Sequence, residues 1–512
     1  MHRLLLSAAL ASAIPVFAAA NTEPIRPLSP AEAAAIVAEL RSAPAQGIVL
    51  PDIGADVAEL SDSRPPARAK AQARLIRDAV AFAAAEHGMD LDPQAIDPNF
   101  DLRAPYDAQA AFDRARAEGR IGAWLDAQTR KDPAYLALLA ARAQYAALAA
   151  SGWPAEVLNG APLEVGMRDA RVPALVERLA AEGYVIAPPP APPLSPSVPT
   201  RSHRHHRRRR KAARRWRLPL YDDRIAAAVA DFQSHHGIPA TGVLDATTVA
   251  ALNVSPADRL QTIDVNLERA RWLPVTMPAD RIEADIAGPI VTLLQGDAPS
   301  LTMRAVAGTP RKQTPIFASE VVAVVFNPPW YVPADIARKE LFPHEVRSPG
   351  YFARNDFIVS KGALIQKAGP MSSLGYIKFD VPDPYEIYLH DTPSRGAFAS
   401  SERWRSHGCM RLQMPRELAA ALLAPQGWTS DAVDKAIADK ATRRVPLATK
   451  TPIFVVYRTA EVADDGKVDF RSDVYGWDAE LAAAMAGGRP AARHPATAPR
   501  RQPRRSSATR GR

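Results

Sequence analysis

Apolar residues recur at helical spacing through the first part of the chain. In residues 67–87 and 133–150, alanine, leucine and aromatic side chains return every three or four positions, which is the period of one face of an α-helix. We interpret the larger side chains at this spacing as core residues: Phe82, Trp124, Leu125, Tyr135, Leu138 and Leu139. The pattern predicts a helical scaffold domain over residues 26–165.

A second group of short helices follows. Leu175 and Leu179 mark one short amphipathic helix, and Ile225, Val229 and Phe232 lie on one face of another. The pattern predicts a small helical module that is separate from the scaffold.

The turns of this module carry a motif. The second helix ends in an aromatic residue and Gln233, and two glycine turns follow, the second at Gly242, before a helix for which Thr247 is the expected N-cap. This arrangement resembles the three-helix peptidoglycan-binding module. The resemblance implies a wall-binding domain over residues 166–255, with an unusual arginine-rich insert at residues 187–217.

Beyond residue 280 the hydrophobic period changes from helix to strand. A helix predicted over residues 261–274 ends at a proline. Short β-branched runs, punctuated by Gly, Pro and Asp, come after it: residues 282–286, 290–294, 301–306 and 321–326. They predict a β-rich domain over residues 280–460, so we expect an α+β multidomain protein.

The composition suits a folded chain of several domains. The chain has 512 residues, of which 47% are hydrophobic and 23% charged, enough for a sizeable core. Residues 1–20 combine a basic start, a short apolar run and three alanines, which is typical of a signal peptide, with an uncleaved N-terminal anchor as the alternative. Later apolar runs are too short for a transmembrane helix. We therefore expect a protein exported to the periplasm.

The net charge of +9 first suggests nucleic-acid binding, but its distribution does not. Residues 187–217 carry ten Lys and Arg, and residues 488–512 carry eight, which leaves 46 basic against 55 acidic residues elsewhere. Both segments are expected to be disordered. A solvated linker is the first interpretation and attraction to an anionic envelope polymer or lipid the second. Metal binding by His203, His205 and His206 is third, because flexible spacing fixes no geometry. The signal peptide argues against nucleic acid as a partner.

The chain has one cysteine, Cys409, which cannot form an internal disulfide. Two short segments, residues 386–390 and residues 406–412, are expected to be strands. Alternation along the first puts Tyr388 and His390 on one face. Alternation along the second puts His407, Cys409 and Arg411 on one face if that segment is extended.

These residue types suit a thiol nucleophile. Such a thiol needs a group that takes its proton, a cationic neighbour that lowers its pKa, and backbone donors for the oxyanion. His390 or His407 can supply the first, Arg411 the second, and the amides around Gly408 the third, where glycine permits a close approach. No cofactor or metal ion is expected, because no residues with metal-ligand spacing lie near Cys409 in the sequence.

The local motif has a family resemblance. The run Ser406-His407-Gly408-Cys409-Met410-Arg411, preceded by His390, resembles the signature of the L,D-transpeptidase catalytic domain. The flanking runs Asn327-Pro328-Pro329-Trp330 and Asp391-Thr392-Pro393-Ser394-Arg395 resemble its large Gram-negative subtype. That subtype joins a scaffold, a wall-binding module and the catalytic domain.

The resemblance implies a role for each site residue. Cys409 is the acylated nucleophile and His390 is its base. Tyr388 lines the site, Gly408 lies by the oxyanion hole and Arg411 supports the catalytic loop.

Two further points concern the loop and its surroundings. His407 is ambiguous, because some relatives carry another residue there, and a role in ordering the loop is favoured over that of the base. The resemblance also implies an insertion over residues 327–369 that caps the substrate. Trp330, Tyr331 and Tyr351 are candidates for its aromatic wall, and core packing explains each of them at least as well.

The implied activity is acyl transfer on peptidoglycan. Cys409 attacks the third residue of a tetrapeptide stem, releases the terminal D-Ala and passes the acyl group to a stem amine, which makes a 3-3 cross-link. The expected partners are stem peptides and glycan, and carbapenems are expected inhibitors. The alternatives are lipoprotein anchoring, D-amino-acid exchange or hydrolysis through the same thioester, and a non-catalytic wall-binding scaffold.

Overall fold

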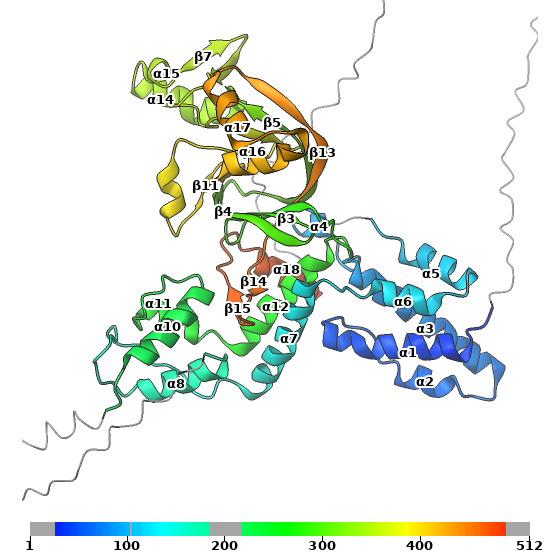
Figure 1. Cartoon of the computed structure of the whole chain (residues 1–512). Coiled ribbons are helices and arrows are strands. Elements are labelled where there is room, and N and C mark those ends of the chain that lie inside the picture. The colour runs from blue at the N-terminus through cyan, green and yellow to red at the C-terminus, as the bar shows by residue number, and fades with distance from the viewer. Residues whose placement is uncertain (1–25, 103–104, 185, 187–217, 488–512) are drawn as a thin grey trace, which may run out of the picture.

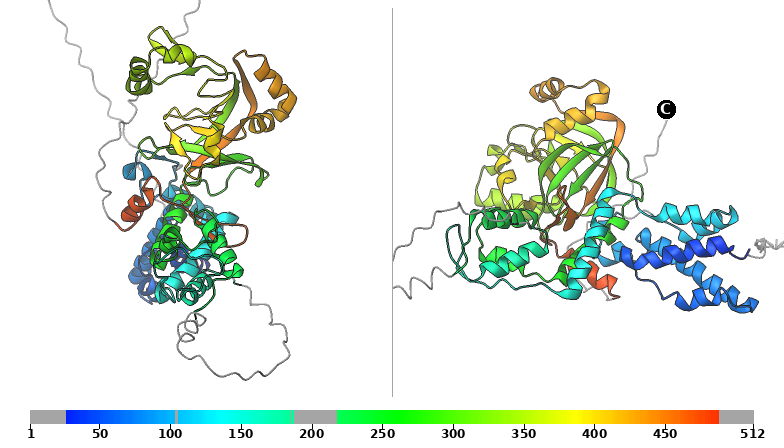
Figure 2. Two further views of the ribbon diagram at one scale, coloured as in Figure 1. Left: turned by 90° about the vertical axis from the view of Figure 1, so that its left-hand side faces the viewer. Right: turned by 60° about the horizontal axis from the view of Figure 1, so that its bottom comes forward.

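The computed structural model describes residues 26–102, 105–184, 186 and 218–487. The expectations for the signal peptide, the basic insert and the basic tail concern residues outside these ranges. Figure 1 shows a β-rich body from which two helical arms diverge, and Figure 2 shows the same arms from two further sides. Within the described ranges, every helix is too short or too polar to cross a bilayer.

The first arm is the helical scaffold. Its helices pack around one core in which Ile36, Leu75, Phe82, Phe112 and Leu125 are buried. Phe82 and Leu125 are therefore core residues, as the helical spacing predicted. These helices are α1 (Pro30–Ser42), η1 (Ala43–Gln46), α2 (Gly54–Glu59), α3 (Pro65–Glu86), α5 (Ala108–Ala117) and α6 (Ile121–Gln128). The short helix α4 (Pro93–Ile96), between α3 and α5 in the sequence, packs against the core of the β-rich body instead.

The next helix joins a different core. Helix α7 (Pro133–Ser151) packs along α12 (Pro256–Arg271), far away in the sequence. These two helices bury Tyr135 and Leu138 together with Phe470, which belongs to a hairpin of β14 (Ala460–Val462) and β15 (Val468–Phe470). We call α7 and α12 the helical junction, because Figure 1 shows both arms and the β-rich body meeting there.

The second arm is the three-helix module of α8 (Val172–Ala181), α10 (Asp223–His235) and α11 (Ala246–Leu252). Buried Gln233 explains the motif. Its side-chain nitrogen donates to the Val243 carbonyl and the Thr248 hydroxyl, both at 2.9 Å, and its oxygen accepts from the Gly242 amide at 2.8 Å. Gly242 has φ +68°, and a Cβ there would lie 2.9 Å from a backbone oxygen, so glycine is required.

One detail of this module was predicted wrongly. The N-cap of α11 is Asp245, whose carboxylate accepts from the Thr248 amide at 2.8 Å. Thr247 instead lies exposed in the first turn. The earlier aspartate reaches the free amide of the first turn, so the helix begins one residue before Thr247.

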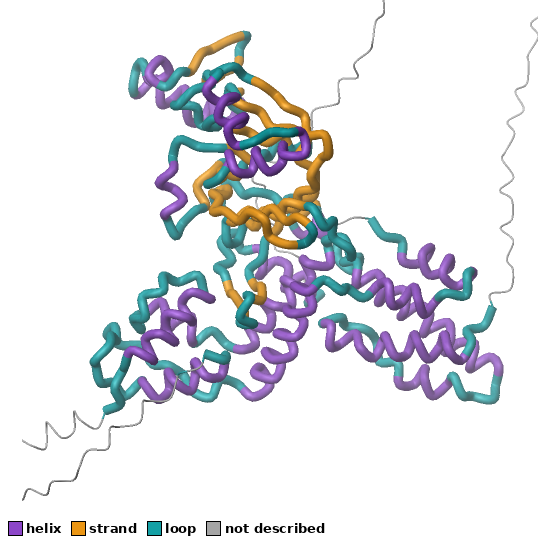
Figure 3. Tube along the Cα trace, viewed as in Figure 1, coloured by secondary structure: helices purple, strands orange, loops and turns teal. Residues whose placement is uncertain are grey.

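The β-rich body is a sheet closed on itself. Its strand order is β1-β5-β13-β2-β3-β4-β12-β10-β9, and β9 also pairs with β5, which makes the sheet barrel-like. The strands are β1 (Phe100–Asp101), β2 (Arg281–Asp285), β3 (Ile290–Gln295), β4 (Ala298–Gly308), β5 (Ile316–Phe326), β9 (Ile377–Asp380), β10 (Leu389–His390), β11 (Trp404–Ser406), β12 (Met410–Leu412) and β13 (Arg443–Val456). Figure 3 shows these strands enclosing one interior.

Helices pack around the barrel, and three of the five contribute buried residues to its core. They are η3 (Arg395–Ala399), α16 (Pro415–Leu423), η4 (Ala424–Gln426), α17 (Ser430–Ala438) and α18 (Trp477–Met485). The core continues past residue 460, because Trp477 and Leu481 are fully buried in it. The Trp477 indole donates to Asp97 at 3.1 Å, which ties this segment to the loop before β1.

Residues 327–369, which we call the insertion, lie between β5 and β9 in the sequence and form a separate layer. A small core of Val332, Ala337, Phe357 and Leu364 holds them together. The elements are β6 (Trp330–Tyr331), α13 (Ala334–Ile336), η2 (Ala337–Leu341), α14 (Phe342–Arg347), α15 (Tyr351–Arg354), β7 (Phe357–Ser360) and β8 (Ala363–Gln366). In Figure 1 the insertion lies at the end of the barrel opposite the helical junction.

Candidate functional site

Strands β10 and β12 run side by side and parallel, with His390 opposite Arg411 and Leu389 opposite Met410. Leu389 and Met410 are buried in the barrel core. Because side chains alternate along a strand, His390 and Arg411 lie on the other face, as do the residues one position before the Leu–Met pair. Those residues are Tyr388 and Cys409, and the Met410 amide donates to the Tyr388 carbonyl at 3.1 Å.

His407 does not share this face with Cys409. The expected extended run is broken into β11 and β12, and Gly408 between them has φ +122°. This backbone turn points the exposed His407 ring toward the insertion, where its Nε2 lies 2.8 Å from a carboxylate oxygen of Glu340. The alternation predicted for His407 fails because only glycine adopts such a φ readily, and the strand ends there.

Two buried hydroxyl groups hold the bend. The Ser406 hydroxyl donates to the Cys409 carbonyl at 2.6 Å and accepts from the Gly408 amide at 3.1 Å. The Thr314 hydroxyl donates to the Gly408 carbonyl at 2.6 Å and accepts from the Gly308 amide at 2.9 Å. The Gly408 amide, a predicted oxyanion donor, is therefore already bonded.

Sequence reasoning did not assign these two roles. Ser406 stands inside the motif, and a hydroxyl residue beside a glycine bend is a usable signal. Thr314 lies 94 residues before Gly408, so no local pattern connects them.

Cys409 is half-buried, and burial raises the pKa of its thiol to about 11. The amide and hydroxyl of Tyr388 oppose this shift without cancelling it. The Sγ atom lies 3.7 Å from the Glu386 carbonyl, on a residue with φ +59°. We expected cationic neighbours to lower the thiol pKa, and desolvation outweighs them.

His390 is buried and neutral at pH 7, because burial first and then Arg411 lower its pKa to about 3. Its Nδ1 lies 2.5 Å from the Asp391 carbonyl. A carbonyl only accepts, so Nδ1 carries the proton and Nε2 is left with a free lone pair. The Asp391 carboxylate in turn accepts from the Tyr376 amide at 2.9 Å and pairs with Arg395 at 3.1 Å.

Arg411 and Tyr388 complete the polar face. Burial lowers the pKa of Arg411 and the nearby Cys409 raises it, and the guanidinium stays charged at pH 7. Burial, followed by Cys409, raises the pKa of Tyr388, and a hydrogen bond from Trp330 of the insertion opposes the rise. The Lys378 ammonium lies 4.4 Å from the Tyr388 ring centroid.

The three aromatic candidates of the insertion have different surroundings. Trp330 is half-buried and reaches Tyr388. Tyr351 packs in the core of the insertion, with its ring centroid 6.0 Å from that of Phe357. Tyr331 is 67% exposed. Of the three, Trp330 is the one with a contact to the site face.

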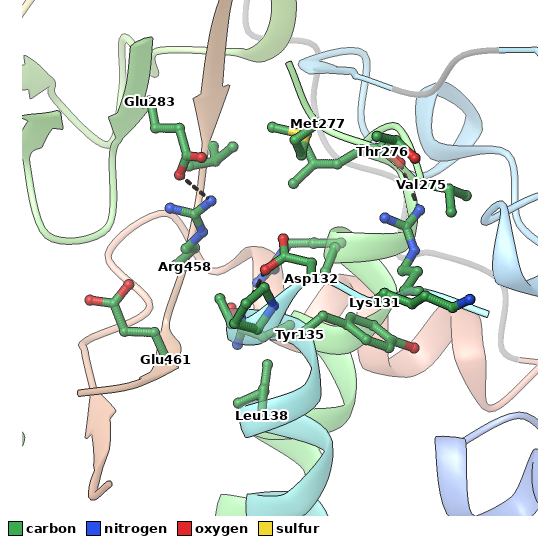
Figure 4. A pocket seen from close by; sticks show the side chains of 18 of the residues that line it. Lys131, Asp132, Tyr135, Leu138, Val275, Thr276, Met277, Glu283, Arg458 and Glu461 are labelled. Atoms are coloured by element: carbon green, nitrogen blue, oxygen red, sulfur yellow. Dashed lines mark hydrogen bonds and ion pairs between the residues drawn. The ribbon is translucent and has the colours of Figure 1, made fainter. Parts of the chain in front are cut away.

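A cavity of about 790 Å³ lies elsewhere, between the helical junction and the adjoining end of the barrel (Figure 4). Tyr135, Leu138, Glu283 and Arg458 are among its lining residues, and Glu283 pairs with Arg458 at 2.6 Å. Cys409 is not among the lining residues. The cavity is therefore separate from the thiol.

Sequence comparisons assign three domains. Residues 279–455 match the L,D-transpeptidase catalytic domain of the YkuD type, residues 220–252 match a peptidoglycan-binding domain, and residues 27–141 match a scaffold domain. A Haemophilus influenzae protein with a provisional assignment as an L,D-transpeptidase is 28% identical over 248 residues, which cover 43% of this chain and 49% of the relative. The chain thus spans about half the length of this curated relative.

Solved structures give a weaker likeness. An L,D-transpeptidase 3 from Mycobacterium tuberculosis, in complex with a faropenem-derived adduct, is 15% identical with a TM-score of 0.19, over 35% of this chain and 60% of that one. An L,D-transpeptidase from Xylanimonas cellulosilytica is 15% identical with a TM-score of 0.18, over 59% of this chain and 100% of that one. At these TM-scores neither structure supports a residue-level comparison.

The fold and the matches define a multidomain α+β protein that couples a scaffold and a peptidoglycan-binding domain to a β-rich catalytic domain. Within it, residues 279–455 are similar to the L,D-transpeptidase catalytic domain.

Proposed function

We propose that this protein is a periplasmic L,D-transpeptidase that makes 3-3 cross-links through a thioester on Cys409. One observation carries the proposal. The single cysteine of the chain is half-buried on a face that it shares with Tyr388, His390 and Arg411, at the ends of two adjacent strands. A thiol, a neutral imidazole and a cation on one face are the groups that cysteine acyl transfer needs.

The first half-reaction starts from neutral groups. The Cys409 sulfur attacks the carbonyl of the third stem residue while its proton passes to Nε2 of His390, either directly or through one water. The bond to the terminal D-Ala then breaks, and the same proton leaves with the D-Ala amine. Because the Gly408 amide is bonded to Ser406, the amide of Cys409 is the expected donor to the oxyanion.

In the second half-reaction a side-chain amine of a neighbouring stem attacks the thioester. The new amide bond forms as the carbon–sulfur bond breaks, and the amine proton returns to sulfur through His390. The three-helix module is proposed to hold the wall polymer near the barrel. Carbapenems are proposed to acylate the same sulfur, which would block both steps.

Product analysis with defined disaccharide-tetrapeptide tests this function. The purified chain is expected to yield dimers with a 3-3 bond and free D-Ala, and Cys409→Ala is expected to yield neither. His390→Gln is expected to slow acylation by about 10²–10⁴-fold, the usual contribution of a general base. The proposal fails if Cys409→Ala makes dimers at the parent rate.

The same products separate the alternatives. Tripeptide without dimers would indicate hydrolysis, and an exchanged fourth residue would indicate D-amino-acid exchange. A stem linked to an added lipoprotein peptide with a free lysine would indicate anchoring. A chain that neither forms products nor takes up a carbapenem on Cys409 by mass spectrometry would be a wall-binding scaffold.

A further inference from the structure

Glu340 joins the insertion to the catalytic loop. It lies in η2, and its carboxylate meets the His407 Nε2 at 2.8 and 3.0 Å. The same carboxylate pairs with the Lys312 ammonium, which comes from the loop between β4 and β5. One side chain of the insertion therefore contacts two separate loops of the barrel.

One of these loops leads directly into Cys409, and the other is bonded to the residue before it. His407 stands two residues before the thiol, and Lys312 stands two residues before Thr314, whose hydroxyl holds the Gly408 carbonyl. Partial burial raises the pKa of Glu340, and hydrogen bonds from Lys312 and then His407 more than offset the rise, so the net shift is downward. The carboxylate is thus ionised where it meets both donors.

The insertion reaches the same face at a second point, where Trp330 contacts Tyr388 beside Cys409. The contacts of Glu340 and Trp330 thus join the insertion at two points to residues that neighbour the half-buried thiol.

We propose that Glu340 is a positioning residue that, through His407 and Lys312, holds the insertion closed beside Cys409 and so restricts access to the sulfur. Glu340, His407 and Lys312 are each about 40% exposed. Ion pairs at such exposure contribute little to stability, so this latch opens readily when a stem peptide enters.

The consequence for catalysis rests on the proposed function. A thioester on Cys409 has two fates. Water attack gives a free carboxylic acid and the thiol, whereas amine attack gives an amide and the thiol, and in both the carbon–sulfur bond breaks and sulfur regains a proton. A closed insertion keeps bulk water away from the thioester and thereby favours the amine.

A labelling experiment tests the latch without any turnover. Because Cys409 is the single cysteine, maleimide labelling of the full chain reports on this sulfur alone. The rate with a bulky polyethylene-glycol maleimide is divided by the rate with N-ethylmaleimide. A change in thiol reactivity scales both rates, whereas an opened insertion favours the bulky reagent.

The variant Glu340→Gln is expected to raise this ratio about two- to fivefold, in keeping with the loss of half-exposed ion pairs. Lys312→Met is expected to raise it less, because the His407 contact remains. The matched control is Asp335→Asn, another ion-paired acid of the insertion, which pairs at 2.7 Å with Arg338 and Lys339 within its own helical segment. It is expected to leave the ratio unchanged.

A second measurement uses the partition of the thioester. The ratio of hydrolysed tripeptide to 3-3 dimer does not depend on how much enzyme is folded, and Glu340→Gln is expected to raise it by the same two- to fivefold factor. Glu340→Asp, which keeps the charge, is expected to recover part of the parent ratio.

The outcomes separate the two proposals. An unchanged labelling ratio in Glu340→Gln overturns the latch, whatever the enzyme makes. An increased labelling ratio in a chain that makes no peptide products supports the latch and overturns the proposed function. An increased labelling ratio with an unchanged partition restricts the latch to access and overturns its role against water.

Discussion

The barrel loop that carries Cys409 and the insertion that lies against it are built in different ways. The loop rests on buried hydrogen bonds from Ser406 and Thr314, above a core that runs through the whole barrel. The insertion has a core of four buried side chains and meets the loop through the half-exposed pairs of Glu340.

This difference separates two tasks. Buried and fully paired polar groups fix the position of the nucleophile, because removing one partner leaves an unsatisfied group in the interior. Exposed ion pairs are worth roughly 0–1 kcal/mol each, so the insertion can move while the nucleophile stays in place. The following predictions test whether the loop and the insertion are as independent as this comparison implies.

The largest effect is expected from emptying either core. Phe326→Ala in the barrel and Phe357→Ala in the insertion each remove a buried ring, and each is expected to cost about 3–5 kcal/mol. Phe326→Ala should lower the global free energy of unfolding. Phe357→Ala should abolish amide protection in residues 327–369 and leave the main transition in place. A shared loss of the main transition in both variants would contradict the comparison.

A methyl group at the bend should damage catalysis more than stability. Gly408 has φ +122°, and a Cβ there would lie 3.0 Å from the Ile387 side chain. Gly408→Ala is expected to slow carbapenem acylation of Cys409 about 100-fold by shifting the nucleophile. Gly427→Ala is the control, because its φ is also positive and nothing lies within 4 Å. Equal acylation rates in these two variants would remove the argument.

A smaller effect is expected from one hydroxyl group under the loop. Thr314→Val keeps the shape of a fully buried side chain but leaves the Gly308 amide and the Gly408 carbonyl without this partner. It should lower the free energy of unfolding by about 2 kcal/mol in urea titration. The matched control position is the partly exposed Thr292, whose hydroxyl lies 3.3 Å from that of Thr302. Thr292→Val should change the free energy of unfolding by less than about 0.5 kcal/mol.

The smallest effect is one of pH. Because the folded protein lowers the pKa of His390 to about 3, the unfolded chain takes up a proton that the folded protein refuses. Stability from this group is therefore full above pH 6.5 and is lost as the pH falls toward 3, by roughly 1.4 kcal/mol per unit. Between pH 6.5 and 5.5 the parent should lose about 1 kcal/mol more than His390→Gln, because the unfolded imidazole is already half protonated at pH 6.5. Parallel pH profiles would show that folding leaves the pKa of His390 unchanged.

The local hydrophobic pattern predicted individual helices and strands well where it was clear. The expected helix at residues 133–150 is α7 (Pro133–Ser151), and the expected strand at residues 290–294 is β3 (Ile290–Gln295). The hydrophobic repeat did not show that α7 packs in the helical junction and not in the scaffold core, because its partner α12 is more than a hundred residues away in the sequence.

The site divides in the same way. Alternation placed Tyr388 with His390 and Cys409 with Arg411, and the register of β10 and β12 brings the two pairs to one face. The same rule misplaced His407, since alternation holds only while the backbone stays extended, and the positive φ of Gly408 ends the strand.

The sequence alone determined which residues share a face within each strand of the site, because side-chain period and a local motif depend on neighbours a few positions apart. Tertiary structure decided the rest: the contact of Glu340 with His407, the support of Gly408 by Thr314, and the raised thiol pKa of Cys409. Each of these depends on burial or on contacts between distant segments, and both arise only when the barrel closes.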